Sequence, residues 1–161
     1  MIKKIVSALV AVLAATTAFA QKNFEVTSPD GTLKTEISVE DGKVTYCVIK
    51  DGITLLTPSE ISMQLADGTS YDGAVRLGKT EKKTVDNVLP AHFYKKAQVK
   101  ENYNQLTLKF KTFDLVFRAY DAGVAYRFVS KSRTPFNLHG YYAQYHALLY
   151  TAWQVLLAQG I

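Results

Sequence analysis

The sequence predicts an all-β protein built as a β-sandwich. Apolar and polar residues alternate along several short runs, and a period of two is typical of a strand with one buried face. Turn-forming dipeptides separate these runs at spacings of roughly ten residues, and no helical period appears before residue 138. Short alternating strands with regular turns are typical of a sandwich. A domain of this length can bury about two thirds of its unfolded surface, which is enough for one core.

The first twenty residues have the parts of a secretory signal peptide. Lys3 and Lys4 give a positive start, and residues 5–15 are almost wholly apolar. Ala18 and Ala20 supply the small side chains that a signal peptidase requires before its cut. The apolar segment is shorter than the ~20 residues that span a bilayer, which argues against a retained membrane anchor. We therefore expect an exported protein, periplasmic or secreted after cleavage at Ala20.

The expected strands begin after this segment and follow one another through short turns. Phe24–Thr27 is the first strand, and the turn residues Pro29, Asp30 and Gly31 follow it. Leu33–Val39 is the second strand, with an apolar residue at every other position. Asp41 and Gly42 lie between two alternating runs, which is a strong hairpin signal. Lys43–Lys50 is therefore expected as the third strand.

The later elements are less regular until the last hairpin. Asp51 and Gly52 form the next expected turn, and Ile61–Leu65 alternates again before Asp67 and Gly68. Residues 70–90 are more polar, and we expect either a longer loop or an irregular edge strand there. His92–Val99 is expected to return to strand.

The clearest hairpin of the sequence lies at residues 115–128. Leu106–Phe110 alternates before it, and residues 121–123 separate two strand-like halves. We interpret Asp121 as a turn former, because aspartate side chains bond to nearby backbone in turns. We expect Gly123 to supply a permissive φ.

Charge and cysteine content exclude several classes of function. The formal charge is +5, and removal of Lys3, Lys4 and no acid with the signal leaves +3. The lysines form two clusters: Lys79, Lys82 and Lys83, and Lys95, Lys96 and Lys100. Neither cluster has interleaved aromatics or a motif, so we expect solvated surface and no nucleic-acid partner. The single cysteine, Cys47, cannot form an intrachain disulfide, and we expect a small buried thiol.

The amino-acid sequence of the last hairpin resembles that of a known protein family. Its distinctive residues are Arg118, Tyr120, Asp121, Gly123, Ala125, Tyr126 and Arg127. Together with residues 28–34, 41–46 and 99–106, in the same order, they resemble the N-terminal domain of glycoside hydrolase family 97. The resemblance covers residues 24–137. Members of that family are exported bacterial α-glucosidases and α-galactosidases.

The resemblance implies a galactose-mutarotase-like β-supersandwich that precedes a catalytic (β/α)₈ barrel. The family's hydrolysis depends on calcium held by glutamates, one of them from later in the N-terminal domain and the others from the barrel. None of those motifs matches a position of this chain. We therefore expect an incomplete, non-catalytic portion that lacks the barrel, with no catalytic residue, no metal ligand and no cofactor of its own.

The acids and histidines give no independent catalytic site. Glycoside hydrolysis needs two carboxyl groups about 5–10 Å apart across the bond. The acids lie mostly in expected turns (Asp30, Asp41, Asp51, Asp67) or on polar strand faces (Glu36, Glu40). The histidines, His92, His139 and His146, lack the further ligands of a metal shell. We expect ordinary surface or packing roles for all of them.

The end of the chain differs in composition from the rest. Thr134–Ile161 contains no Asp, Glu, Lys or Arg, and it is rich in Ala, Leu and Gln, which favour helix. We expect the sandwich domain to occupy residues 21–137, with a helical, non-family tail at 138–161. Three hypotheses stay open for the tail: an aberrant or frameshifted end, a transmembrane helix over residues 141–160, or an amphipathic helix that covers a sheet edge. Positive flanking residues on the exported side disfavour the second.

A carbohydrate is the expected partner, of the α-glucan or α-galactoside type. Exposed aromatic rings could stack on sugars, and the speculative candidates for this role are Phe93, Tyr94 and Tyr103, with Tyr71 considered beside them. Packing in a core explains strand aromatics equally well. The alternatives to a fragment of a hydrolase are a stand-alone exported carbohydrate-binding module and a membrane-tethered exported β protein.

Overall fold

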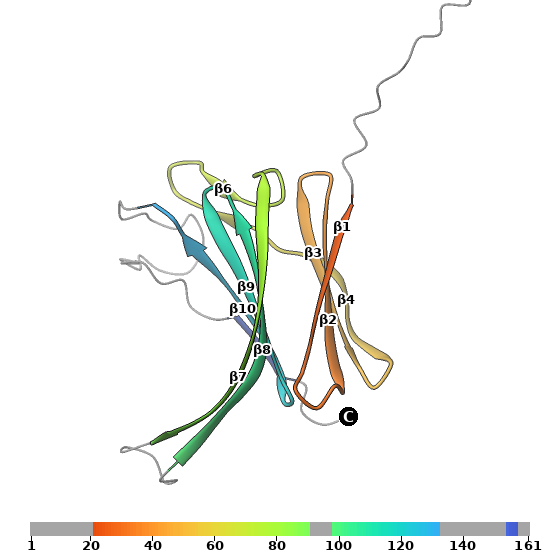
Figure 1. Ribbon diagram of the computed structural model, residues 1–161. Coiled ribbons are helices and arrows are strands. Elements are labelled where there is room, and N and C mark those ends of the chain that lie inside the picture. The colour runs from red at the N-terminus through yellow and green to blue at the C-terminus, as the bar shows by residue number, and fades with distance from the viewer. Residues whose placement is uncertain (1–20, 91–97, 133–153, 158–161) are drawn as a thin grey trace, which may run out of the picture.

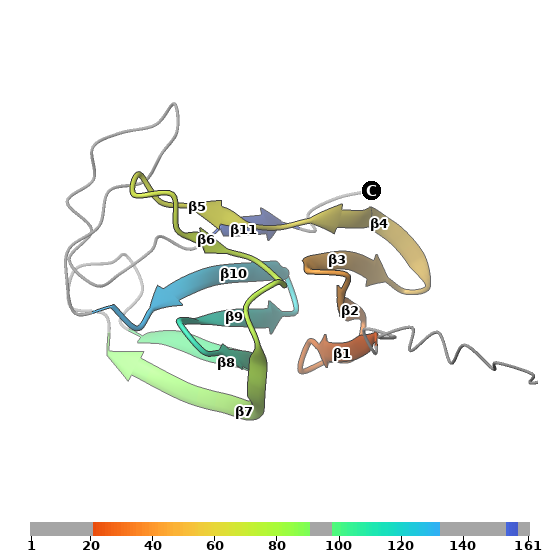
Figure 2. The ribbon, with the colours of Figure 1, turned by 90° about the horizontal axis from the view of Figure 1, so that it is seen from above.

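Every assigned element of the structure is a β-strand, which confirms the predicted all-β class (Figure 1). The computed structural model describes residues 21–90, 98–132 and 154–157. Its strands form one four-stranded, one five-stranded and one small two-stranded sheet. The two larger sheets face each other across a shared apolar core, so the architecture is a β-sandwich (Figure 2).

The four-stranded sheet is an antiparallel meander. Its strands, in spatial order, are β1 (Lys22–Thr27), β2 (Leu33–Glu40), β3 (Lys43–Lys50) and β4 (Ile53–Glu60). Asp41 and Gly42 have φ values of 48° and 76°, and Asp51 and Gly52 have values of 49° and 81°. Two successive positive φ values define the type I′ turn that matches the twist of a hairpin. Both predicted Asp-Gly turns are therefore confirmed.

The five-stranded sheet contains the hairpin that carried the family resemblance. Its strands, in spatial order, are β11 (Gln154–Leu157), β10 (Gly123–Ser130), β9 (Phe113–Tyr120), β8 (Gln98–Phe110) and β7 (Leu77–Pro90). β9 pairs with β10 along its whole length, as predicted for residues 115–128. The small sheet joins β5 (Met63–Gln64) to β6 (Ser70–Tyr71).

Two details of the sheet sharpen or correct the sequence predictions. Of the two alternatives for residues 70–90, the structure favours the irregular edge strand, because β7 lies at the sheet edge and its register shifts between Leu77 and Thr80. Gly123 does not supply a permissive φ: it is the first residue of β10. The described glycines with positive φ are Gly31, Gly42, Gly52 and Gly68.

The C-terminal strand corrects the prediction of a helical tail. Residues 154–157 pair with β10 from Tyr126↔Gln154 to Gly123↔Leu157, so a helix over residues 141–160 is wrong for these four. The open edge of β10 offers backbone partners to an apolar segment, and such pairing overrides a modest helix propensity. Residues 138–153 and 158–161, which carry the rest of that prediction, lie outside the described ranges.

The core is formed by alternate residues of both large sheets. Leu33, Ile37 and Val48 are at most 1% exposed on the four-stranded sheet, and Phe113 and Phe117 are fully buried on β9. The rings of Tyr46 and Phe117 cross between the sheets with centroids 5.9 Å apart. Full burial of each such side chain contributes about 1.5–3 kcal/mol, so this layer holds the sheets together.

One part of the β7–β8 hairpin extends beyond the sandwich. β9 pairs with β8 only from Asn104 to Lys109, and residues 86–90 and 98–102 pair only with each other among the described residues. We call these two segments the arm; Figure 1 shows β7 and β8 leaving the body together. Val88 and Val99 in the arm are 58% and 42% exposed.

In the three described ranges, no helix is long and apolar enough to span a bilayer. The segment considered above as a transmembrane helix lies mostly outside those ranges.

Candidate functional site

The predicted sugar-stacking residues do not form an open aromatic surface in the described structure. Phe93 and Tyr94 lie outside the described residues. Tyr103 is 4% exposed, and Tyr71 is 2% exposed with its ring stacked on Phe113 at 4.8 Å. The buried position of Tyr103 and Tyr71 fits the packing alternative, because a stacking platform must present a ring face to solvent. A role of these residues in sugar binding stays a prediction.

Tyr103 instead belongs to a closed cluster with the family-like hairpin. The guanidinium of Arg118 lies 4.1 Å from the Tyr103 ring centroid, and the Tyr120 ring is 5.2 Å from it. Arg118 Nε donates to Gln105 Oε1 at 2.9 Å. Burial raises the pKa of the Tyr103 hydroxyl above its usual range. This cation–π and hydrogen-bonded arrangement joins β8 to β9.

Asp121 has a structural contact that the sequence did not reveal. Its Oδ1 accepts a hydrogen bond from the backbone N–H of Asp30 at 3.1 Å. Asp30 itself accepts bonds from the Ser28 hydroxyl and from the N–H of Thr32. Asp121 therefore ties the β9–β10 turn of one sheet to the β1–β2 turn of the other. The interpretation of Asp121 as a turn residue holds, and the turn also bridges the sandwich.

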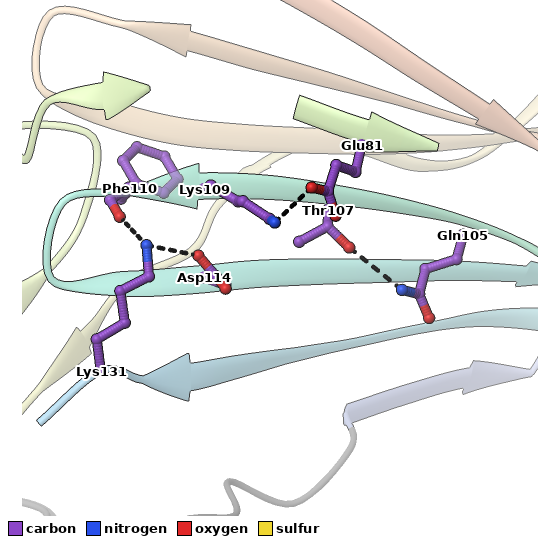
Figure 3. A network of polar contacts seen from close by, with 7 residues as sticks. All are labelled: Glu81, Gln105, Thr107, Lys109, Phe110, Asp114 and Lys131. Carbon is purple, nitrogen blue, oxygen red and sulfur yellow. Dashed lines mark hydrogen bonds and ion pairs between the residues drawn. The ribbon is translucent and has the colours of Figure 1, made fainter. Parts of the chain in front are cut away.

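The outer face of the five-stranded sheet carries a polar network (Figure 3). Lys109 Nζ bonds to Glu81 Oε1 at 2.5 Å, linking β8 to β7. Lys131 Nζ lies 2.8 Å from Asp114 Oδ1 and also bonds to the carbonyl of Phe110. Each cation is neutralised by an acid on a neighbouring strand. The network therefore links neighbouring strands, and each of these charged groups already has a partner of opposite charge.

A hollow of about 630 Å³ lies on the outer face of the four-stranded sheet, and we call it the outer hollow. Polar side chains from three strands line it, among them Asn23, Glu25, Glu36, Ser38 and Thr45. Glu25 and Glu36 are directly paired across β1 and β2. Side chains at such positions have Cβ atoms about 4.5–5.5 Å apart. The sheet register thus brings two carboxylates together in one hollow.

Lys34 forms an ion pair with one of these carboxylates, Glu36. Its Nζ lies 2.5 Å from Glu36 Oε1. The hydrogen bond from Lys34 lowers the pKa of Glu36 below its usual value. Glu36 and, more weakly, Glu25 raise the pKa of Lys34 in turn. Both groups are exposed, so the pair is a solvated ion pair that keeps Glu36 ionised at neutral pH.

Cys47 corrects a sequence prediction, because it lines the outer hollow and is only partly buried. Cys47 lies opposite Glu36 on β3, and its Sγ is 3.7 Å from Glu36 Oε2. Partial burial, and then the negative charge of Glu36, raise the pKa of the thiol. Cys47 is therefore accessible but a weak nucleophile at neutral pH.

A second hollow, of about 270 Å³, lies between the edge strands of the two sheets, and we call it the edge hollow. Its lining comes from β1, β7 and β8. Asn104 spans the sheets there: its Nδ2 donates to the Thr27 carbonyl at 2.9 Å, and its Oδ1 accepts from the Thr84 hydroxyl at 2.7 Å. Glu25 and Lys82 line both hollows, so the two hollows adjoin at these residues.

A glycosidase uses two neighbouring carboxyl groups, and the sheet register places Glu25 and Glu36 opposite each other. In such an enzyme one carboxyl has a raised pKa so that it can act as the acid. Lys34 shifts the pKa of Glu36 the opposite way. Within the described residues, no group of three or more acidic, histidine or cysteine side chains lies together in a way that could hold a metal ion.

Sequence reasoning missed Glu25, Lys82 and Asn104 as lining residues. The Glu25–Glu36 pairing had a usable signal, because the turn at residues 28–32 fixes the register of β1 against β2. Lys82 and Asn104 had none, since they meet β1 only when the two sheets pack.

Comparison with known proteins gives concordant results from sequence and structure. The sequence profile described as Glycosyl-hydrolase 97 N-terminal matches residues 26–154. A retaining alpha-galactosidase of Bacteroides thetaiotaomicron is 42% identical over 137 residues, which are 84% of this chain and 20% of that protein. The chain thus spans about a fifth of the length of this curated relative. The profile match also extends past residue 137, where we expected the resemblance to end.

Solved structures share the fold. A glycoside hydrolase family 97 enzyme of Pseudoalteromonas sp. strain K8, in complex with acarbose, superimposes with a TM-score of 0.63 at 19% identity, over 71% of this chain and 19% of that one. A beta-arabinopyranosidase has a TM-score of 0.61 at 22% identity, over 71% and 20% of the two chains. The profile match covers most of the chain, and the β-sandwich agrees with it. The chain therefore belongs to the Glycosyl-hydrolase 97 N-terminal family.

Proposed function

We propose that this chain is the non-catalytic N-terminal β-sandwich part of a calcium-dependent family 97 glycoside hydrolase. The observation that carries the proposal is the family match over residues 26–154. The 42% identity to a retaining alpha-galactosidase favours an α-galactoside as the substrate of the whole enzyme. The complexes of the Pseudoalteromonas relative with acarbose and panose keep α-glucosides as the second substrate class.

The chemistry of the described residues supports a non-catalytic role. Among the described residues, the sheet register places the carboxylates of Glu25 and Glu36 opposite each other in a hollow. Lys34 holds Glu36 as an anion, so Glu36 does not serve as the proton donor that the leaving group needs. No group of three or more acidic, histidine or cysteine side chains lies together among the described residues, so the calcium ligands would come from elsewhere in the enzyme.

In the whole enzyme, this domain would act as a rigid scaffold associated with the carbohydrate. The residues that hold calcium and perform the hydrolysis would then come from the four fifths of the relative's length that this chain does not span. Export, which rests on the signal-like residues 1–20, is part of the same proposal. An exported chain would encounter polymeric or oligomeric sugars outside the cytoplasm.

Activity of the purified chain tests the proposal. The substrates are 4-nitrophenyl α-galactoside and 4-nitrophenyl α-glucoside, each assayed with calcium and again after chelation. We expect release of nitrophenol at the rate of buffer alone in all four conditions. The retaining alpha-galactosidase of B. thetaiotaomicron, assayed in parallel, shows that the conditions detect turnover. Calcium-dependent turnover by the chain itself would contradict the non-catalytic assignment.

A stand-alone carbohydrate-binding function is the second candidate. The adjoining outer and edge hollows favour it, because they are lined by hydrogen-bonding side chains and open to solvent.

A further inference from the structure

We infer that the outer and edge hollows together form a binding furrow for a neutral oligosaccharide. The polar furrow runs over the outer face of β1–β3 and continues between β1 and β7. The inference rests on the proposed function for its ligand class, α-linked sugars. It adds a binding site on the sandwich itself.

The first argument is that the two hollows adjoin. The outer hollow encloses about 630 Å³ and the edge hollow about 270 Å³, and both have Glu25 and Lys82 in their walls. Their combined size falls in the range of small-molecule sites, roughly 300–1,000 Å³. An elongated ligand of two or three sugar rings fits such a shape better than a compact one.

The second argument is the chemistry of the lining. Asn23, Ser38 and Thr45 in the outer hollow, and Thr84 and Asn104 in the edge hollow, offer both donors and acceptors. Sugar hydroxyls are also both donors and acceptors, so they can satisfy such a surface along its length. Thr84 and Asn104 already bond to each other, and Asn104 also bonds to Thr27, so a sugar would use their remaining donors and acceptors. An apolar ligand would displace water from these polar groups without replacing its hydrogen bonds, at a cost in free energy.

The third argument is charge balance. The lining contains two carboxylates, Glu25 and Glu36, and two ammonium groups, Lys82 and Lys83. Opposite charges in equal number favour a neutral ligand over a phosphate, a nucleic acid or an acidic peptide. Aromatic stacking contributes little, because the Tyr46 ring packs against Phe117 and Tyr126. We therefore expect weak affinity that depends on hydrogen bonds.

Cys47 gives a direct probe of occupancy, because it is the single cysteine of the chain and lines the outer hollow. The experiment measures the rate at which a maleimide labels Cys47 in the purified chain, with raffinose or maltotriose added up to about 20 mM. Raffinose carries an α-galactoside and maltotriose carries α-glucosides, so the two arms separate the sugar classes. We expect at least one of them to slow the labelling in a saturable manner.

Variants locate the site. Glu25→Gln and Lys82→Gln change the two residues that line both hollows. Each should lower the affinity for the protecting sugar roughly fivefold to tenfold. Glu40→Gln and Lys79→Gln make the same changes on β2 and β7, at positions that line neither hollow, and should leave protection unchanged. All four positions are exposed, and far-UV circular dichroism checks that each variant is folded.

Two results would overturn the inference. One is the absence of protection by either sugar in the wild-type chain. The other is protection that Glu25→Gln and Lys82→Gln leave unchanged, which would place the sugar elsewhere. Neither result tests the proposed absence of hydrolysis. Turnover in the activity assay would refute the proposed function but would leave the inference about the furrow standing.

Discussion

The β9–β10 hairpin and the arm of the β7–β8 hairpin are both antiparallel pairs, yet they differ in almost every other respect. β9 lies between β8 and β10, and Phe113, Leu115 and Phe117 are fully buried on its inner face. The arm pairs with itself alone among the described residues, and Val88 and Val99 are exposed on it. Backbone pairing therefore does not by itself give a stable element; burial of the paired strands does.

The residues expected to stabilise the fold and those expected to bind a ligand also lie in different regions of the chain. The central hairpin carries the family-like residues, and these form closed contacts such as the Arg118 to Tyr103 pair. The polar furrow lies at the periphery, on the outer face of one sheet and along the edges of both. We expect mutations in the centre to change the free energy of unfolding, and mutations at the periphery to change binding.

The largest effect on stability is expected when a buried side chain of the central hairpin is shortened. Phe117→Ala removes a fully buried ring that contacts Tyr46 and Tyr126. We expect a loss of about 3–5 kcal/mol in the free energy of unfolding. Val88→Ala in the arm is the control, and it should change that free energy by less than about 0.5 kcal/mol. Urea unfolding measures both, and similar losses for the two variants would break the comparison.

A smaller effect of the opposite sign is expected at Thr35. This residue of β2 is fully buried, and its hydroxyl has no hydrogen-bond partner in the described structure. Thr35→Val keeps the shape and removes the unpaired hydroxyl, so we expect a gain of about 1 kcal/mol. Thr54→Val, at an exposed position on β4, is the matched control and should change little. A destabilised Thr35→Val variant would show that the hydroxyl has a partner.

Tyr71→Phe tests the polar contact at the end of the core. The Tyr71 hydroxyl lies 2.7 Å from Ser130 Oγ in a buried position. Its loss should cost about 1–2 kcal/mol, while the ring keeps its stacking on Phe113. A double-mutant cycle with Ser130→Ala isolates the pair. Additive effects of the two substitutions would argue against the contact.

The pH dependence of stability should depend on Asp30. Hydrogen bonds from Ser28, then from Thr32, lower the pKa of Asp30 below its ordinary value of 3.8. A lowered pKa stabilises the fold above pH 3.8, and this stabilisation is lost as the pH falls through the folded-state pKa. Asp30→Asn should therefore show a smaller drop in urea midpoint between pH 7 and pH 3 than the wild type does. Equal drops in Asp30→Asn and the wild type would count against this assignment.

The sequence predicts those features of the fold that depend on local chemistry. Asp41 and Gly42 specify a type I′ turn by themselves, so the β2–β3 hairpin was predictable. β7 showed no clean alternation, because an edge strand with an exposed arm does not need a buried face. β11 was missed since its strand conformation depends on the open edge of β10, which is distant in sequence.

The candidate site was less predictable than the fold, and for a related reason. Tyr103 was selected by residue type, but its burial depends on Arg118 and Tyr120 of the next strand. The furrow joins Glu25 to Lys82, two residues that meet only through sheet packing. Residue type identifies what a side chain can bind, whereas tertiary packing decides which side chains are open to a ligand.

The central claim is that this family 97 domain forms a sandwich without catalytic chemistry of its own. The most direct test is the rate of 4-nitrophenyl α-galactoside hydrolysis, with calcium, by the wild-type chain and by Glu36→Gln side by side. We predict that both rates equal that of buffer. A wild-type rate above buffer that Glu36→Gln abolishes would show that the Glu25–Glu36 pair is catalytic, and it would contradict the account.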